Sequence, residues 1–397
     1  MSSLLLSHFT ATSALGRGLA ATLSALEAGR TGLAPCRFET VTLDTCVGEV
    51  AGLDTLPLPP TLAEFECRNN RLAFLGLSQD GFSAAVENSA ARWGRDRVAV
   101  FVGTSTSGIL ETELAYRRRD PLSGALPGDF RYAGAHNTFS LAAFVQRALR
   151  LQGPAVVISS ACSSSAKVFA SARRAITAGI VDAAVVGGVD SLCLTTLYGF
   201  HSLQLVARAP CRPFDRERDG ISIGEAAAFA LLERPRTAPA ADALLLLGTG
   251  ESSDAHHMSS PPPDGRGARA AMLQALAAAA LQPAAIDYIN LHGTGTPSND
   301  EAEARAVASV LGPELPASST KGATGHTLGA AGALEAVICA LALRHGLLPG
   351  GINTRAVDPG LGVHYLLGNR RAKLRRVMSN SFGFGGSNCS LIFGRHG

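Results

Sequence analysis

The sequence has little of what marks several large classes of protein. Its 8 cysteines stand alone, with no CxxC pair and no spacing typical of a zinc site. We therefore expect no bound metal, and reduced thiols in the cytoplasm are the simplest interpretation. The charges almost cancel, with 35 Lys and Arg against 32 Asp and Glu, which argues against nucleic acid as the main partner. We expect no membrane span, because the apolar run ALEAVICALAL is too short and contains Glu335.

The first residues also lack the features of a secretion signal. MSSLLLSHFTATSALG has no basic start and no clear cleavage site after its three leucines, so we expect it to form a first strand. What the chain does contain is 46% hydrophobic residues and 43 glycines. That composition is typical of a tightly packed α/β protein with many tight turns, and it argues against long disordered segments.

Apolar, β-branched runs bounded by glycine alternate with Ala-rich helical stretches along the chain. This alternation predicts parallel or mixed sheets with helices on their faces. A polar break, ERPRTAPAAD, predicts a boundary near 235 between an N-terminal half, 1–235, and a C-terminal half, 236–397. The expected strands lie at 97–105, 155–161, 182–191, 243–250, 287–295 and 389–394, and the expected helices at 169–179, 267–281 and 328–346.

One cysteine, Cys162, lies in a setting that favours reactivity. The stretch VVISSACSSSAKVFASA, 156–172, runs from a buried strand into a helix of small residues, and Cys162 falls between them. A residue at a helix N-terminus meets free backbone N–H groups and the positive end of the helix dipole, which lowers a thiol pKa and favours the nucleophilic thiolate. A buried cysteine that only packs is the alternative, and it is the expected role of the other seven.

Two histidines follow in glycine-rich turns. His292 comes directly after the strand DYINL, in INLHGTGTPSNDEAE, and His326 shares the segment STKGATGHTLGAAGALE with Lys321. Catalytic groups concentrate at such strand and loop ends, although a lone histidine there is more often structural. Metal binding and phosphate binding fit poorly, because HExxH and GxxxxGK[ST] are absent.

A fourth segment, NSFGFGGSNCS at 380–390, surrounds two phenylalanines with small residues just before the last expected strand. Glycines of this kind let a backbone approach a substrate closely. A backbone N–H group in this segment would complete an oxyanion hole, and a simple tight turn is the alternative.

Together these segments resemble the β-ketoacyl-acyl carrier protein synthases, the elongating condensing enzymes of fatty acid and polyketide synthesis. SACSSS resembles the nucleophile motif of that family, HGTGTPSND its first histidine motif and KGATGHTLGAAG its lysine and second histidine motif. NSFGFGGSN resembles the closing glycine-rich loop, and RPFDRERDGISIGEAA, 212–227, a fifth family segment. The resemblance covers nearly the whole chain, and the order and spacing of the motifs make it specific.

The resemblance implies a fold and a mechanism. The fold is the thiolase fold, an α/β fold in which two similar halves with mixed five-stranded sheets form α-β-α-β-α layers. Cys162 takes an acyl chain from the phosphopantetheine of a carrier protein as a thioester. Decarboxylation of malonyl-carrier protein gives an enolate that His292 and His326 hold, and its carbanion attacks the acyl-Cys162 carbonyl. The N–H groups of Cys162 and Phe384 form the oxyanion hole. No cofactor of its own is implied.

Further residues take roles through the same resemblance. Lys321 is placed near the site with Glu303 as its ion-pair partner, since a buried lysine needs one, and Asp300 supports the turn. The phosphopantetheine arm is lined by Thr294 and Thr296. Phe384 gates the nucleophile, while Phe200 and Phe382 border the acyl pocket, with ordinary core packing as the alternative for all three phenylalanines.

The resemblance also implies partners. Carrier proteins are acidic, so the basic side chains Arg68 and Arg71, or the run Arg117–Arg119, are candidates for docking, although such clusters are usually only solvated faces. A homodimer is usual in the family. SACSSSAK and departures such as Ser160 and Ala226 favour a specialised pathway, of the bacterial aryl polyene pigment type, over fatty acid synthesis. There, a chain-length-factor-like partner would replace one protomer. The alternative, a catalytically silent partner chain, is disfavoured because Cys162 is present.

Overall fold

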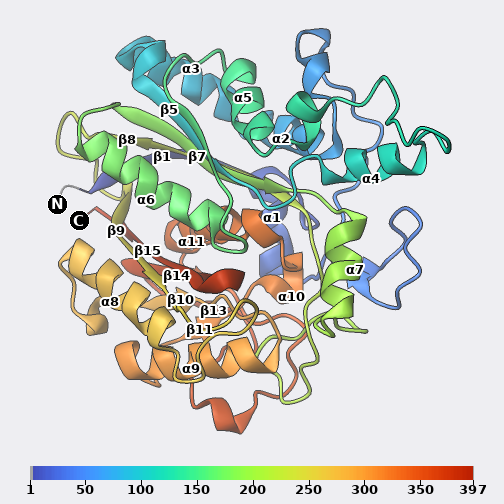
Figure 1. Cartoon of the computed structure of the whole chain (residues 1–397). Coiled ribbons are helices and arrows are strands. Elements are labelled where there is room, and N and C mark those ends of the chain that lie inside the picture. Colours follow the sequence, from blue (N-terminus) through green and yellow to red (C-terminus); the bar gives the residue numbers. More distant parts are fainter. Residues whose placement is uncertain (1–2, 397) are drawn as a thin grey trace.

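The computed structural model describes residues 3–396 and arranges them in five layers (Figure 1). Two sheets alternate with three layers of helices, so the order is helices, sheet, helices, sheet, helices. This is the layered α/β arrangement that the family resemblance implies.

The sheet of the N-terminal half has five strands in the order β6-β5-β7-β8-β1. β5 pairs in parallel with β6 and β7, whereas β8 pairs antiparallel with β7 and β1. Every residue of β5, β7 and β8 is buried, as expected for strands that helices cover on both faces. The strands are β1 Leu4–Ser13, β5 Val98–Gly103, β6 Ala155–Ile158, β7 Ala183–Asp190 and β8 Ala226–Glu233.

The sheet of the C-terminal half repeats this topology. Its order is β11-β10-β14-β15-β9, with the same sequence of parallel and antiparallel pairs. Two residue pairs between β1 and β9 join the two sheets edge to edge. The halves are therefore structural repeats, although their sequences show no clear repeat. The strands are β9 Leu244–Ser253, β10 Tyr288–Asn290, β11 Ala317–Ser318, β14 Arg376–Gly383 and β15 Ser387–Arg395.

Helices fill the three remaining layers. α6 and α11 lie between the sheets, α2, α3 and α5 cover the N-terminal sheet, and α8 and α9 cover the C-terminal sheet (Figure 1). The helices are α1 Gly18–Glu27, α2 Arg68–Leu77, α3 Phe82–Trp93, α4 Ile109–Arg117, α5 Phe139–Ala148, α6 Ser164–Thr177, α7 Leu194–Ser202, α8 Arg266–Ala279, α9 Pro297–Leu311, α10 Lys321–Thr324 and α11 Ala331–His345. Short strands β2 Gly16–Arg17, β3 Ala34–Pro35, β4 Cys46–Val47, β12 Leu347–Leu348 and β13 Arg370–Arg371 complete the fold.

The central helix α11 is apolar on nearly all sides. The helical stretch Leu328–His345 is long and apolar enough to cross a membrane, by length and composition alone, which the sequence analysis had discounted. In the structure 89% of this stretch is buried inside the protein, because α11 packs against both sheets and against α6. Core packing therefore accounts for its apolar character.

The predicted first strand, the six further strands and the three helices each overlap an observed element. Two central strands were missed. β8 has the sequence AAAFALLE, and alanine is depleted in strands, so this run gives little strand signal. β14 ends in the residues NSFG, which were interpreted as part of a glycine-rich turn. The predicted boundary at 235 falls in the connection between β8 and β9 and stays a prediction.

Candidate active site

Cys162 lies in a sharp turn between β6 and α6. Ala161, directly before it, has a φ of 51°, a left-handed conformation that residues with a side chain adopt rarely. Neighbouring serines hold the turn: the Ser160 N–H donates to Ser164 Oγ at 2.8 Å, and the Ser163 hydroxyl donates to the Ser160 carbonyl oxygen at 3.0 Å. The sequence therefore places a buried thiol at the entry to a 14-residue helix.

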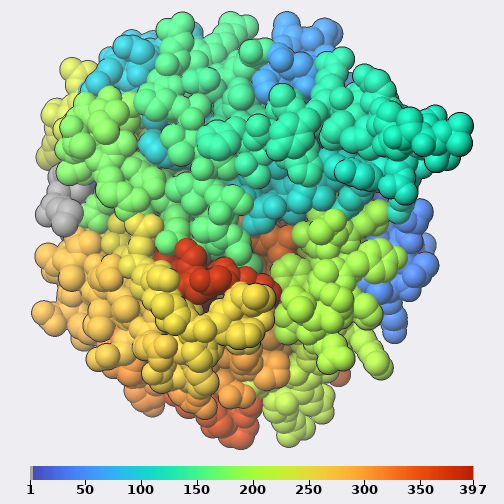
Figure 2. Space-filling view, in the orientation of Figure 1, coloured from blue at the N-terminus to red at the C-terminus, as the bar shows by residue number. Residues whose placement is uncertain are grey.

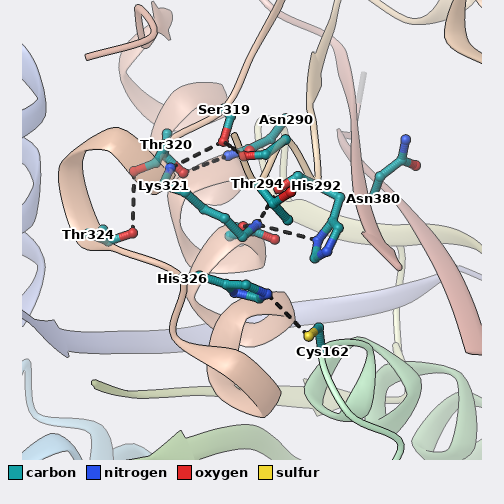
Figure 3. A network of polar contacts seen from close by, with 12 residues as sticks. Cys162, Asn290, His292, Thr294, Ser319, Thr320, Lys321, Thr324, His326 and Asn380 are labelled. Carbon is teal, nitrogen blue, oxygen red and sulfur yellow. Dashed lines mark hydrogen bonds and ion pairs between the residues drawn. The ribbon is translucent and has the colours of Figure 1, made fainter. Parts of the chain in front are cut away.

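Both predicted histidines reach Cys162 from the C-terminal half (Figure 3). His326 Nε2 lies 3.1 Å from Cys162 Sγ. The ring centroids of His292 and His326 lie 5.3 Å apart, with the rings close to perpendicular. His292 follows β10, and His326 follows α10, which comes directly after β11. The carboxyl ends of the parallel strands β10 and β11 thus lead to His292 and His326. The contact of His326 with Cys162, which follows β6 of the other sheet, joins residues 164 positions apart in the sequence.

Lys321 lies beside His292 and is buried. Its Nζ lies 3.4 Å from His292 Nδ1 and also donates to the His292 carbonyl oxygen. Its ion-pair partner is Glu335 on α11, so the predicted ion pair between Lys321 and Glu303 is wrong. An ammonium group only donates hydrogen bonds, so His292 Nδ1 is the acceptor and the proton of the neutral ring lies on Nε2.

Two carboxylates on α9 hold the turn that carries His292. Glu303 accepts hydrogen bonds from the backbone N–H groups of His292 at 2.8 Å and Gly293 at 2.7 Å, and a third from a side-chain amide on β14. These three hydrogen bonds stabilise the buried Glu303 carboxylate without an ion pair to Lys321. Asp300 accepts from the backbone N–H of Thr294 at 3.1 Å and so supports the turn, as expected.

The two histidines are neutral at neutral pH. Burial lowers the pKa of both rings well below the usual value, and the charge of the nearby Lys321 adds to the effect. Each ring therefore carries one N–H group. In His326 the Nδ1 atom has no hydrogen-bond partner within residues 3–396, so a neighbour fixes the tautomer of His292 but not that of His326.

The pKa of the Cys162 thiol differs from the value expected from the sequence. Burial raises its pKa to about 11, although Lys321 and the backbone N–H groups of Phe384 and of Cys162 itself act in the opposite direction. The expectation of a lowered pKa is wrong, because desolvation of a fully buried thiolate outweighs the favourable groups at the helix N-terminus. The resting site holds a thiol. The two N–H groups that favour the thiolate are the pair predicted to form the oxyanion hole.

A cleft between the two halves leads to Cys162. Its open space, including the mouth, is about 610 Å³. All five predicted pocket residues line it, namely Phe200, Thr294, Thr296, Phe382 and Phe384. The hydroxyl oxygens of Thr294 and Thr296 lie 2.9 Å apart, and the rings of Phe200 and Phe384 lie 5.6 Å apart. Figure 2 shows the C-terminal segment, in red, at the centre of this face between segments of the two halves.

Two glycines let the closing loop approach the nucleophile. A Cβ atom at Gly383 would lie 2.7 Å from the carbonyl oxygen of Ser160 in the Cys162 turn. Gly386 has a φ of 77°, and a Cβ atom there would lie 2.7 Å from the side chain of Asp254. Glycine is therefore required on both sides of Phe384, whose N–H group reaches the sulfur only through this close packing.

Comparison with known proteins identifies the family. The family models of the β-ketoacyl synthase N-terminal and C-terminal domains match residues 77–238 and 244–355. A Coxiella burnetii protein named 3-oxoacyl-[acyl-carrier-protein] synthase 2 is 33% identical over 405 residues, which cover 96% of each chain. The chain belongs to the β-ketoacyl synthase family.

Solved structures show the same β-ketoacyl synthase fold over the full length. In the complex of the ketosynthase ApeO with its chain length factor ApeC from Xenorhabdus doucetiae, one chain is 40% identical, with a TM-score of 0.89 and coverage of 99% of this chain and 98% of that one. A β-ketoacyl synthase from Burkholderia phymatum is 30% identical, with a TM-score of 0.88 and full coverage of both chains. These likenesses confirm the predicted family and thiolase fold.

The matches to the first curated relatives are shorter. The mitochondrial 3-oxoacyl-[acyl-carrier-protein] synthase of Arabidopsis thaliana is 41% identical over 260 residues, which cover 61% of this chain and 56% of that protein. The chain therefore matches less than two thirds of the length of these relatives.

Some residues of this β-ketoacyl synthase site were not singled out from the sequence. Glu335 was noted only as a charge within an apolar run, yet a single acid in such a helix signals a buried cation nearby. Asp190, at the end of β7, accepts from the backbone N–H groups of Ser105 at 2.8 Å and Gly329 at 2.5 Å. It thus ties the loop after β5 to the segment that follows His326, and its position directly after an apolar strand was the available signal.

The arginines predicted to dock a carrier protein are engaged within the chain. Arg68 is 3% exposed and pairs with Glu225 at 2.7 Å and Glu49 at 3.2 Å. Arg71 is half-buried and pairs with Glu66. The prediction is corrected for Arg68, because a buried and neutralised guanidinium group offers no charge to an acidic surface. The run at 117–119 is exposed.

Two sets of atoms in the site have the chemistry of metal ligands. The ligand atoms of Cys162, His292 and His326 lie within 4.8 Å of one another. Zinc binds cysteine as a thiolate, which the raised thiol pKa and the Lys321 charge oppose. The expectation of no metal stays a prediction.

The second set consists of buried oxygens on β10, β14 and α11. Asn290 Oδ1, Glu335 Oε2, Ser379 Oγ and Ser381 Oγ have no hydrogen-bond partner among the described residues. Asn290 and Ser379 are register partners on β10 and β14. Water or a cation that prefers oxygen ligands would satisfy such atoms.

Proposed function

We propose that this chain is a β-ketoacyl-acyl carrier protein synthase, an acyltransferase that adds a malonyl-derived unit to an acyl chain held on Cys162. The observation that carries the proposal is the 3.1 Å contact between Cys162 Sγ and His326 Nε2, with His292 beside it. One nucleophile and two neutral imidazoles in a buried site match the needs of an enolate-forming condensation.

The first step is acyl transfer to Cys162. The sulfur attacks the thioester carbonyl of the acyl chain on the phosphopantetheine of a carrier protein. The bond from that carbonyl to the pantetheine sulfur breaks, and the thiol proton ends on the departing sulfur. A thiol with a pKa of about 11 needs a proton acceptor in contact, and His326 Nε2 is in that position. The N–H groups of Cys162 and Phe384 receive the negative charge of the tetrahedral intermediate.

The second step forms the carbon–carbon bond. Malonyl-carrier protein loses carbon dioxide and leaves an enolate, whose oxygen accepts hydrogen bonds from the Nε2–H groups of His292 and His326. His326 accepts a proton at Nε2 in the first step and donates from Nε2 in this one, a change of tautomer that is possible because its Nδ1 has no hydrogen-bond partner among the described residues. The enolate carbon attacks the acyl carbonyl, the bond to Cys162 breaks with the electron pair on sulfur, and the resulting thiolate takes up a proton that comes from water. Lys321 supports this step by keeping the proton of His292 on Nε2. Thr294 and Thr296 line the path of the phosphopantetheine arm, and Phe200 and Phe382 border the acyl chain.

The proposed protein partners are an acyl carrier protein and a second thiolase-fold chain. Within residues 3–396 the edge strand β6 pairs only with β5, and its four residues are half-buried. An apolar hollow lies near it, lined in part by Phe101, Ala175 and the exposed Ile180. An unpaired edge beside an apolar hollow suits the addition of a strand from another chain, either a copy of this one or a chain-length-factor-like partner.

The proposed pathway is a specialised one, of the aryl polyene type. The 40% identity to a chain of the complex of a ketosynthase with its chain length factor supports this choice, as do the sequence departures from the common family motifs. We further propose a cytoplasmic location and activity without a resident cofactor, with neither nucleic acid nor membrane as a partner.

Separating the two steps tests the proposal. Cys162→Ala should abolish acyl transfer from acyl-carrier protein. His292→Ala should keep acyl transfer, followed by intact mass, but should lose at least ~100-fold in carbon dioxide release from malonyl-carrier protein. Release of carbon dioxide at the wild-type rate by His292→Ala would overturn the assigned role. A catalytically silent partner chain would show neither step in the wild type.

A further inference from the structure

Helix α7 receives its N-terminal cap from another helix. The side chain of its own N-cap residue, Cys193, contacts the Thr196 hydroxyl at 3.2 Å but makes no capping hydrogen bond to a backbone N–H group of the first turn. The carboxylate of Glu113 on α4 accepts hydrogen bonds instead, from the backbone N–H groups of Leu194 at 2.9 Å and Thr195 at 2.7 Å. Such bonds are charge-assisted, and the helix dipole strengthens them. Glu113 thus tethers α7 to α4, which lies next to it (Figure 1).

α7 forms one wall of the cleft. Its residue Phe200 lines the cleft and contacts Phe384, the residue that supplies an oxyanion-hole N–H group. Leu110 and Leu114 of α4 belong to the same apolar cluster as Leu197 and Phe200 of α7. Movement of α7 relative to α4 therefore changes the space beside Phe200 where an acyl chain would lie.

α4 in turn is tied to the catalytic residues. The loop that precedes it donates the backbone N–H groups of Ser105 and Thr106 to Asp190, at 2.8 and 2.9 Å. The same carboxylate accepts from Gly329, three residues after His326. Asp190 thus fixes the start of α4 relative to the segment that follows His326. Glu113 in turn fixes α7 relative to α4.

We infer that Glu113 is a positioning residue that sets the acyl-chain selectivity of the cleft by fixing α7, and with it Phe200, relative to α4. The inference rests on the proposed function, because selectivity has meaning only if Cys162 accepts acyl chains. Glu113 touches no reacting atom. Its effect is therefore expected on the choice of chain and not on the chemistry at the sulfur.

The test compares Glu113→Gln with the wild type over a series of acyl-carrier proteins of increasing chain length. A glutamine places an N–H₂ group against one of the two backbone donors, so one hydrogen bond is lost. We expect the ratio of Cys162 acylation rates between the longest and shortest accepted chains to change by at least about fivefold, since one methylene in an apolar pocket discriminates by about tenfold or more. Alkylation of Cys162 by iodoacetamide should change by less than about twofold, because the surroundings of the sulfur stay the same.

Two variants separate positioning from simple stabilisation. Asp287→Ala is the control, because it removes a carboxylate that also accepts hydrogen bonds from two consecutive backbone N–H groups, those of Arg375 and Arg376. It should keep the wild-type selectivity. Cys193→Ser, added to Glu113→Gln, supplies a local cap for α7 without restoring the tether to α4. Thermal stability should recover in this double variant, while selectivity should stay altered.

The outcomes are distinct. Unchanged selectivity in Glu113→Gln, or selectivity restored by the local cap, would overturn the positioning role while leaving the proposed function intact. Failure of the wild type to become acylated would contradict the proposed function and, with it, this inference.

Discussion

Replacing Glu335 by glutamine tests which acid neutralises the buried Lys321. The side chains of Lys321 and Glu335 are 1% and 3% exposed, so bulk water cannot compensate either charge. Removing one partner of a buried ion pair costs about 3–5 kcal/mol. At about 2.1 cal/mol/K per residue, the 397 residues give an unfolding entropy of about 0.8 kcal/mol/K. We therefore expect Tm to fall by about 4–6 °C.

A double-mutant cycle with calorimetry isolates the pair. Glu335→Gln should cost several kcal/mol in the wild-type background and much less in Lys321→Met, where no buried cation remains. Glu303→Gln is the matched control, because Glu303 is equally buried but binds backbone N–H groups. Its cost should be nearly the same in both backgrounds. Coupling of Lys321 to Glu303 instead of Glu335 would refute the reasoning.

Three further changes have defined expected outcomes. A Cβ atom at Gly103 would lie 2.5 Å from the backbone nitrogen of Ser165 on α6. Gly103→Ala should therefore lower the free energy of unfolding by about 1–3 kcal/mol. An unchanged midpoint in chemical denaturation would contradict this packing. The folded state disfavours protonation of His326, so lowering the pH below about 6.5 destabilises the wild type. His326→Gln should therefore gain about 1.4 kcal/mol relative to the wild type per pH unit below that value, and parallel stability profiles of the two proteins would contradict this. Because burial raises the thiol pKa of Cys162 to about 11, its alkylation by iodoacetamide should accelerate from about pH 7 to pH 10, and a plateau below about pH 8 would show a preformed thiolate.

The chemistry-bearing segments were predictable because each one is local in the sequence. The strand before Cys162, the strand before His292 and the glycine turn with His326 each place a side chain at a strand or loop end, where catalytic groups concentrate. The resemblance to a known family then predicted that these residues form one active site, and it predicted the thiolase fold. The structure adds the distances between these residues.

The long-range partners were not predictable in the same way. Glu303 and Glu335 are both buried acids near Lys321, and nothing local in the sequence shows that backbone N–H groups already satisfy the first. Similarly, Arg68 lies in a polar segment that resembles a solvated face, and its partner Glu225 is 157 positions away. The thiol pKa of Cys162 depends on total burial, which the whole fold determines, so the helix N-terminus alone predicted its direction incorrectly.

The most direct test of the central claim is the intact mass of the protein after incubation with acyl-carrier protein, with Cys162→Ala measured beside it. The wild type, purified with any co-expressed partner chain, should gain the mass of one acyl group, and the variant should gain none. Addition of malonyl-carrier protein should then remove the acyl group and yield a β-ketoacyl-carrier protein. No mass gain with any chain length, or an equal gain in Cys162→Ala, would contradict the account.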